Sequence, residues 1–314
     1  RGPRVVKAAA GRGLGWLFPG QGTQSPGMAG RIGSGVVGFE TALDETLEEF
    51  AALGLDGLRD LVVHARIAAD LPGADDGPAA QLRQTVLAQP ALFAIEYALA
   101  RAWSDVVEEP RVLVGHSVGE YAAATIAGVM TLRDACRIVA ARGRLMQEMP
   151  TGSMVAIMRA LPQVSALLPD ELDVAAVNGP SSFVVSGPSD RIDALTAKLK
   201  LLGIEHTPLR TSHAFHSRMM EPAADALRDV MATVDLRPPR IPIVSTVTGD
   251  WLDDASATDP DYWRRQIIQP VLFGDAAVRA AEVADVFTEL GPGDTLSSLT
   301  RVAARFLPKS RNDQ

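Results

Sequence analysis

Two kinds of hydrophobic pattern alternate along the chain, and each predicts a different element. Short continuous apolar runs are typical of buried strands, and the first two occupy residues 14–18 and 112–115. Apolar residues spaced three and four positions apart predict amphipathic helices at 36–53, 86–103, about 118–128 and about 131–148. The last of these helices begins with Thr131 and Asp134 in the capping-box pattern.

The pattern changes between residues 152 and 211. Four segments there resemble strands, MVAIMRA, LDVAAVN, SFVVSG and IEHTPLR, and two resemble helices, LPQVSALLP and DRIDALTAKLKLLG. Their order, βαββαβ, is the split βαβ pattern. We therefore expect a small domain at 152–211 that is inserted into a larger one.

After the insert, strands and helices alternate again. A helix is expected after residue 217, a strand at IPIVST, and a strand, tight turn and helix in VADVFTELGPGDTLSSLT. Strands that alternate with helices on both sides of the insert predict a parallel α/β core. The sequence thus predicts a large α/β subdomain built from 14–151 and 212–305, with linker stubs at 1–13 and 306–314.

Composition narrows the class of protein. Of the 314 residues, 47% are hydrophobic and 22% are charged, which predicts a substantial packed core. The formal net charge of −8 argues against a nucleic-acid partner, because that partner requires a basic surface. Cys136 is the single cysteine, so neither an intrachain disulfide nor a cysteine-based zinc site can form.

The chain lacks the sequence signals of a membrane or secreted protein. No apolar run reaches the roughly 18 residues that a membrane span needs, and no signal-peptide hydrophobic region is present. The first residue is Arg1, and both ends of the chain are polar or basic. We interpret the chain as a piece of a longer cytoplasmic polypeptide.

The stretch GHSVG at residues 115–119 matches G-x-S-x-G, the pattern of a nucleophile elbow. It follows a predicted strand and precedes a predicted helix, which is the context that the pattern requires. The small flanking residues let the backbone bend sharply and leave room for substrate beside Ser117. Free amides and the positive dipole end of the helix would face a developing oxyanion. The alternative is a tight turn that merely contains a serine.

A nucleophilic serine needs a base, and the histidines of the chain are His64, His116, His206, His213 and His216. His116 adjoins the serine, and His206 lies in the last strand of the insert. His213 and His216 lie where the insert returns to the core, at a junction that borders a cleft. This position favours the last two, but spacing alone does not choose between them, and each could be purely structural.

Arg142 interrupts the apolar face of its predicted helix. Winding residues 131–148 at 100° per residue places Arg133, Arg137 and Arg144 on the solvated side. Arg142 falls among the apolar residues instead. A buried guanidinium is costly without an anionic partner. The partner is either an internal carboxylate or the carboxylate of a substrate, which a guanidinium binds through two parallel hydrogen bonds.

Five motifs occur in order along the chain: FPGQGTQ at 18–24, GHSVGE at 115–120, RGRLMQ at 142–147, HAFHS at 213–217 and ELGPG at 289–293. Together they resemble the malonyl-CoA:acyl-carrier-protein transacylase family, and in particular the acyltransferase domains of polyketide synthases. The resemblance runs from about residue 14 to about 305. It implies an α/β-hydrolase-like large subdomain and an inserted ferredoxin-like small one, in agreement with the βαββαβ pattern.

The resemblance also implies roles for individual residues. Ser117 corresponds to the nucleophile, His216 to its base, and Arg142 to a carboxylate clamp. The residues implied for supporting roles are Gln21 and Val118, whose backbone amides would form the oxyanion hole, Gln266, whose backbone carbonyl would orient the imidazole, and Gln89, which would line the pocket. The catalytic unit would then be a Ser-His dyad.

Two positions indicate the acyl group. Family members that choose malonyl commonly have the phenylalanine of HAFHS, which is Phe215 here, whereas methylmalonyl types commonly carry YASHS. Phe215 would fill the space that a 2-methyl branch needs. Val118 agrees, because methylmalonyl types commonly have glutamine there. One methyl group changes the discrimination by roughly 1–3 kcal/mol in an apolar pocket. Ordinary core packing is the alternative role for Phe215.

The expected function is transfer of malonyl from malonyl-CoA, through an acyl-serine, to the phosphopantetheine thiol of an acyl carrier protein, in contact with neighbouring synthase domains. No cofactor or metal is expected.

One alternative is a serine hydrolase such as a thioesterase. The third member of its catalytic triad would be an acid before the histidine, and the candidates are Asp170, Asp173 and Asp190. The other alternative is an inactive docking domain of a synthase.

Overall fold

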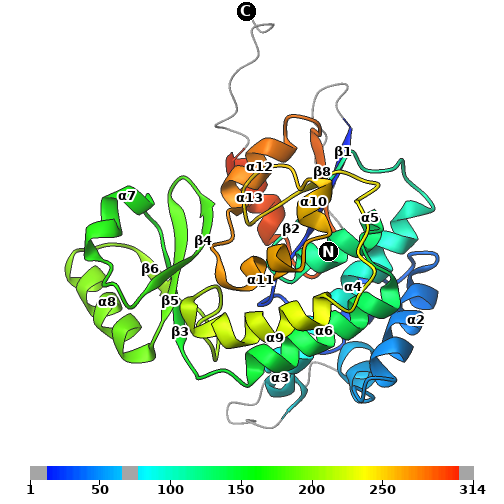
Figure 1. The fold of residues 1–314 in the computed structure, drawn as a ribbon, viewed down its shortest axis with the longest axis horizontal. Helices are drawn as coiled ribbons and strands as arrows, with labels where there is room; N and C mark the ends of the chain where they lie inside the picture. Colours follow the sequence, from blue (N-terminus) through cyan, green and yellow to red (C-terminus); the bar gives the residue numbers. More distant parts are fainter. Residues whose placement is uncertain (1–12, 66–76, 304–314) are drawn as a thin grey trace, which may run out of the picture.

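A computed structural model describes residues 13–65 and 77–303 of the chain. Two separate sheets organise these residues, and Figure 1 shows the parallel sheet in the right half of the molecule and the antiparallel one in the left half. We call the antiparallel sheet and its helices, residues 153–208, the small lobe, and the other described residues the large lobe. Apart from Gly13, the expected linker stubs lie outside the described residues.

The sheet of the large lobe has the strand order β7-β2-β1-β8, and all of its pairings are parallel. Its strands are β1 Leu14–Phe18, β2 Val112–Gly115, β7 Ile243–Val244 and β8 Val286–Glu289. The sheet is buried because helices pack against it, among them α5 Gly119–Ala127, α12 Phe273–Ala280 and α13 Thr295–Ala303. The predicted parallel α/β core is therefore confirmed.

The helices of the large lobe agree with the hydrophobic pattern in the first half of the chain. The longer ones are α2 Phe39–Ala51, α4 Thr85–Ser104, α5 Gly119–Ala127, α6 Leu132–Gln147, α9 Glu221–Met231, α11 Pro260–Ile268, α12 Phe273–Ala280 and α13 Thr295–Ala303. The short ones are α1 Met28–Ile32, α3 Pro78–Gln81, α10 Asp254–Ala257 and the single turns η1 Asp60–His64 and η3 Arg218–Met220. The pattern did not single out α10, α11 or α12. None of the described helices is both long and apolar enough to span a membrane.

The small lobe has the predicted βαββαβ order. Its elements are β3 Ser153–Ile157, α7 Leu161–Val164, η2 Ser165–Leu167, β4 Asp173–Gly179, β5 Ser182–Gly187, α8 Ser189–Leu201 and β6 His206–Pro208. The strands form an antiparallel sheet in the order β4-β5-β3-β6, as expected for a ferredoxin-like unit. A core of its own, which includes Val155, Phe183 and Leu195, joins α8 to the sheet.

A backbone seam at Val271 helps to join the two lobes. The Val271 amide donates to the Ala175 carbonyl at 2.9 Å, and the Val177 amide donates to the Val271 carbonyl at 2.8 Å. The edge strand β4 is thereby held against the chain between α11 and α12. Because this seam fixes the lobes side by side, residues of both can line one crevice.

Candidate active site

The serine elbow has the strained geometry that its motif predicts. Ser117 lies between β2 and α5 with φ of 53°, a left-handed conformation that is uncommon for residues other than glycine. A Cβ at Gly115 would lie 2.2 Å from the Glu120 nitrogen, and one at Gly119 would lie 2.2 Å from the Phe18 carbonyl oxygen. The flanking glycines therefore allow backbone to pack on backbone. This corrects the expectation that they leave room for substrate.

His216 is the histidine that faces the serine. Its Nε2 lies 2.8 Å from Ser117 Oγ, and its Nδ1 lies 3.0 Å from the carbonyl oxygen of Gln269. A carbonyl can only accept, so the proton of the neutral ring is on Nδ1, and Nε2 is free to accept the serine proton. His216 itself has φ of 54°, so both partners of this hydrogen bond have left-handed backbones.

The imidazole of His216 is neutral at neutral pH. Burial, together with the positive charge of Arg142, lowers its pKa to about 3, and the hydrogen bond to the Gln269 carbonyl only partly opposes this. A neutral imidazole is the form that can take a proton from a hydroxyl group.

The carbonyl that orients the imidazole belongs to Gln269, so the expectation for the Gln266 carbonyl is wrong. Gln266 is inside α11, where carbonyls point along the helix axis. Gln269 is the residue after the helix, with extended φ and ψ of −82° and 158°, so its carbonyl turns away from that axis. The Gln266 side chain instead donates from Nε2 to the Ser117 carbonyl oxygen at 2.7 Å. The signal for Gln269 was Pro270, because a helix usually ends before a proline.

The other histidines have different partners. His213 Nε2 lies 3.1 Å from the Met149 carbonyl oxygen, and its Nδ1 lies 2.7 Å from Ser212 Oγ. His116 Nε2 lies 3.1 Å from Asn178 Oδ1 in β4. His206 Nδ1 lies 2.8 Å from the Ile204 carbonyl oxygen, and His64 is exposed. The folded chain thus distinguishes His216 from His213, which spacing could not.

Arg142 is buried, as its place on the apolar face of α6 predicts, with 1% of its surface exposed. Its Nη2 donates to Ser117 Oγ at 3.3 Å, and its guanidinium carbon lies 5.3 Å from the centre of the Tyr121 ring. Among the described residues no carboxylate forms an ion pair with it, and Nε and Nη1 are buried without an acceptor. The internal salt bridge is therefore not found, and two buried N–H donor groups remain available for an anion.

A crevice of about 350 Å³ opens in front of Ser117 and His216. Its large-lobe walls include Gln21, Gln89 and Phe215, and its small-lobe walls include Met154, Met158 and Val184. Gln21 lies in the loop after β1 and Ser117 in the turn after β2, so the crevice lies at the carboxyl ends of the parallel strands, where open α/β sheets bind ligands. The hydrophobic pattern did not identify the small-lobe wall, because each residue in it also fits a core position.

The supporting residues lie around the same point. Val118 is the N-cap of α5, and neither its amide nor that of Gln21 donates to an acceptor in the described part of the chain. Gln89 is buried, with its Nε2 3.5 Å from Gln21 Oε1. Phe215 is also buried, and its ring centre lies 6.0 Å from that of His213. Two free amides beside a serine can bind an oxyanion.

No acid completes a triad in the described residues. His216 Nδ1 contacts a carbonyl oxygen, and Asp173, a candidate for the acid, forms an ion pair of 2.7 Å with Arg218 instead. Asp170 and Asp190 lie on the exposed surface of the small lobe. The geometry therefore matches a Ser-His dyad supported by a backbone carbonyl.

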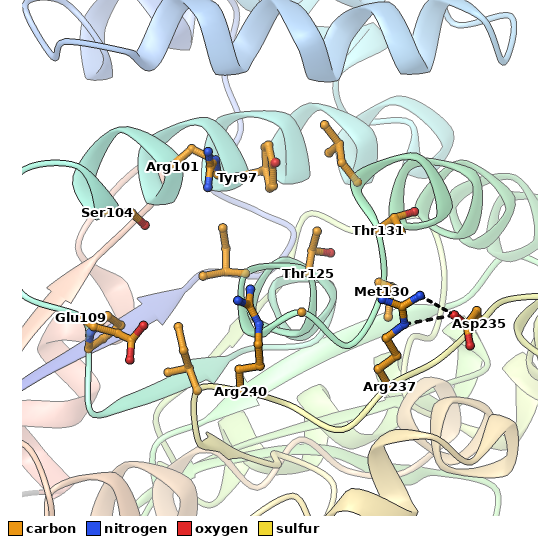
Figure 2. A pocket seen from close by; sticks show the side chains of 15 residues that line it. Tyr97, Arg101, Ser104, Glu109, Thr125, Met130, Thr131, Asp235, Arg237 and Arg240 are labelled. Atoms are coloured by element: carbon orange, nitrogen blue, oxygen red, sulfur yellow. Dashed lines mark hydrogen bonds and ion pairs between the residues drawn. The ribbon is translucent and has the colours of Figure 1, made fainter.

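A second, larger hollow of about 500 Å³ lies at the opposite edge of the parallel sheet. Pro110 and Ile241, which line it, precede β2 and β7. Figure 2 shows Arg101 on α4 and Arg240 on the chain before β7, both beside this hollow. Both arginines are exposed, and neither forms an ion pair with a described carboxylate.

Comparisons with known proteins agree with this geometry. The family model described as "Acyl transferase domain" matches residues 15–305. The chain is 38% identical over 286 residues to a component of the phenolphthiocerol/phthiocerol polyketide synthase of Mycobacterium tuberculosis, covering 90% of this chain and 18% of that protein. It is 42% identical over 309 residues to the spectinabilin polyketide synthase system protein NorB of Streptomyces orinoci, covering 95% of this chain and 14% of that protein. The chain thus spans less than a fifth of these curated relatives.

Solved structures give the same result. The acyltransferase domain from the second module of the salinomycin polyketide synthase has a TM-score of 0.83 and 38% identity, over 94% of this chain and 67% of that one. The malonyl CoA-acyl carrier protein transacylase of Burkholderia pseudomallei has a TM-score of 0.79 and 30% identity, over 95% of this chain and 100% of that one.

Proposed function

The chain belongs to the acyl transferase domain family, in the form found in polyketide synthases, and on that premise we propose that it transfers malonyl from malonyl-CoA to an acyl carrier protein. The acceptor is the phosphopantetheine thiol of that carrier protein. One observation carries the proposal: Ser117 Oγ lies 2.8 Å from His216 Nε2 and 3.3 Å from Arg142 Nη2. A nucleophile, its base and an anion-binding group thus meet at one atom.

The first half-reaction forms an ester on Ser117. His216 Nε2 takes the hydroxyl proton while Oγ attacks the thioester carbonyl carbon of malonyl-CoA. The amides of Gln21 and Val118 stabilise the oxyanion, and loss of one such donor typically costs about 2.7–4 kcal/mol of barrier. The C–S bond then breaks, and His216 returns the proton to the CoA thiolate.

The second half-reaction releases the acyl group. His216 takes the proton of the phosphopantetheine thiol, whose sulfur attacks the ester carbonyl carbon. The same amides stabilise the second oxyanion, the C–O bond to Ser117 breaks, and the proton returns to Oγ. His216 remains neutral between the two half-reactions because burial keeps its pKa low.

Arg142 binds the malonyl carboxylate in both half-reactions. Its buried Nε and Nη1 have no acceptor among the described residues, so a carboxylate would satisfy groups that are costly to leave unpaired. The carboxylate would also offset the charge that depresses the pKa of His216. A malonyl substrate would therefore strengthen the base that it needs, whereas an acetyl group would not.

Phe215 and Val118 support the choice of malonyl over methylmalonyl. Phe215 is buried and lines the crevice, where its ring would occupy the space beside the 2-carbon of the acyl group. Gln89 lines the same crevice and would hold Gln21 in place through its side-chain contact at 3.5 Å.

The partners follow from the size of the relatives. The chain covers 14–18% of two polyketide synthase proteins, so it would function between neighbouring synthase domains. These domains would supply the acyl carrier protein and consume its malonyl thioester.

Intact-protein mass spectrometry tests the proposal. After a brief exposure to mixed malonyl-, methylmalonyl- and acetyl-CoA, we expect one malonyl adduct that a carrier-protein thiol removes and that is absent in Ser117→Ala. Rapid release of free malonate with no accumulated adduct would indicate a hydrolase. Absence of both an adduct and labelling by a serine-reactive probe would indicate an inactive docking domain.

A further inference from the structure

Glu120 is a buried carboxyl group that the proposed mechanism does not use. It lies three residues after Ser117, in the first turn of α5, and none of its surface is exposed. No arginine, lysine or histidine nitrogen in the described part of the chain lies within 4 Å of it. A buried carboxylate without a cation is costly, so the protonation state of Glu120 needs an explanation.

The hydrogen bonds around Glu120 indicate that it carries a proton. Tyr262 donates its hydroxyl proton to Oε1. Thr246 Oγ1 lies 2.8 Å from Oε2 and 3.2 Å from the Gly115 carbonyl oxygen. Thr246 has a single hydroxyl proton, so it cannot donate to both. If Oε2 is protonated, Glu120 donates to Thr246 and Thr246 donates to Gly115, and every group has a partner.

The electrostatic surroundings agree with this assignment. Burial raises the pKa of Glu120 to about 7, although hydrogen bonds from Tyr262, Thr246 and Gln266 oppose the rise. The titratable or charged groups that interact with it are Tyr121 on α5, Arg142 on α6 and Tyr262 on α11. Arg142 is the charged one, and its Nη2 donates to Ser117 Oγ and does not form an ion pair with Glu120.

The same residues hold both sides of the serine elbow. Thr246 contacts the Gly115 carbonyl before Ser117, and Gln266 donates to the Ser117 carbonyl at 2.7 Å. We call Glu120, Thr246, Tyr262 and Gln266 the elbow cluster. Its hydrogen bonds compensate for a backbone conformation, φ of 53° at Ser117, that is unfavourable by itself.

We propose that Glu120 is a positioning residue whose neutral acid keeps Thr246 donating to Gly115 and so holds Ser117 in line with His216 and Arg142. The proposal rests on the acyl transfer proposed above. Loss of the proton would turn the Thr246 hydroxyl toward the carboxylate and leave the Gly115 carbonyl without it. It would also add an anion near Arg142 that competes with the carboxylate of the substrate.

Glu120→Gln is the decisive variant, with Glu120→Ala as its matched control. A glutamine can accept from Tyr262 and donate to Thr246 at every pH, so it imitates the protonated acid. At about pH 6 we expect the glutamine variant to keep kcat/KM for malonyl loading within about threefold of the wild type. The alanine variant should lose about 10- to 100-fold, because it leaves buried polar groups unpaired.

The pH profile separates positioning from simple structural support. Wild-type kcat/KM should fall as the pH rises through about 7, where Glu120 ionises, and this limb should be absent in Glu120→Gln. His216 does not produce this limb, because its pKa of about 3 lies far below. A glutamine variant as damaged as the alanine variant at pH 6, or one that keeps the limb, would overturn the proposal.

A stability measurement tests Glu120 independently of activity. Between its ordinary pKa of 4.5 and about 7, Glu120 binds a proton in the folded state and not in the unfolded state. The free energy of unfolding of the wild type, measured relative to that of Glu120→Gln, should therefore fall as the pH rises through this range. The other buried titratable groups, among them Glu96 and His216, contribute alike to both proteins and cancel in this difference. If the wild type loads no malonyl, acyl transfer is wrong but this slope still tests the neutral acid. Equal slopes in both proteins would refute it.

Discussion

Arginines lie beside both the crevice and the hollow, but only Arg142, which contacts Ser117 in the crevice wall, is buried. Arg142 has 1% of its surface exposed, and two of its nitrogens have no acceptor among the described residues. Arg101 and Arg240 line a hollow of about 500 Å³, against about 350 Å³ for the crevice, but both are exposed. Water solvates an exposed guanidinium, whereas a buried one needs an anion. The unpaired buried charge, and not the size of the cavity, thus identifies the site where a ligand is expected.

Removing the buried charge should have the largest effect. In Arg142→Ala, kcat/KM for malonyl-CoA should fall by about 10²- to 10⁴-fold, because loss of one partner of a buried pair costs about 3–5 kcal/mol. Acetyl loading should change much less, so the preference for malonyl collapses. Intact-protein mass spectrometry with both donors measures the ratio, and a wild-type ratio in the variant would contradict the clamp.

The same variant should shift the acid limb of the pH profile. In the wild type, burial and Arg142 lower the pKa of His216 to about 3, so kcat/KM should stay flat as the pH falls to about 5. Without Arg142 the imidazolium loses a repelling cation, its pKa rises, and the limb moves to higher pH. Pre-steady-state loading across this range gives the measurement, and identical limbs in both proteins would show that Arg142 does not act on His216.

Phe215 should control the acyl group with a moderate effect. In Phe215→Ala, the ratio of kcat/KM for methylmalonyl-CoA to that for malonyl-CoA should rise by about tenfold, because one methyl group changes discrimination by roughly 1–3 kcal/mol. Competition between the two donors, read by mass, gives the ratio directly. An unchanged ratio would leave Phe215 with a packing role only.

Removing the exposed charges should have the smallest effect. The double variant Arg101→Gln, Arg240→Gln should load malonyl within about twofold of the wild type and unfold within about 0.5 kcal/mol of it. Loading kinetics and chemical denaturation check the two values. A loss as large as that in Arg142→Ala would mean that the hollow, too, binds a ligand needed for the reaction.

Local patterns predicted the parts of the site that depend on neighbouring residues. The serine elbow follows from a strand, two glycines and a helix, and the burial of Arg142 follows from the periodicity of one helix. Residues that meet across the fold were harder to identify. His216 and His213 have the same local surroundings in sequence, and only the folded chain brings His216 to within 2.8 Å of Ser117, 99 positions away.

The sequence pattern did not predict the contacts of the site that depend on the direction of the backbone. Gln266 and Gln269 have different roles because α11 ends between them. A helix boundary that is misplaced by three residues assigns the carbonyl contact of Gln269 to Gln266, which contributes its side chain instead. The partners of Glu120 were not identified because Thr246 and Tyr262 lie 126 and 142 positions away. The resemblance supplied the roles of Gln21 and Val118, which have no side-chain signal because only their amides are involved.

The left-handed backbone at position 117 limits which residues could replace the serine. A threonine has the same hydroxyl group, but its β-branch is a genuine outlier at a φ of 53°. A cysteine has no such branch and would fit the same bend. The backbone conformation at this position therefore limits which nucleophilic residues evolution can place there, whatever their reactivity.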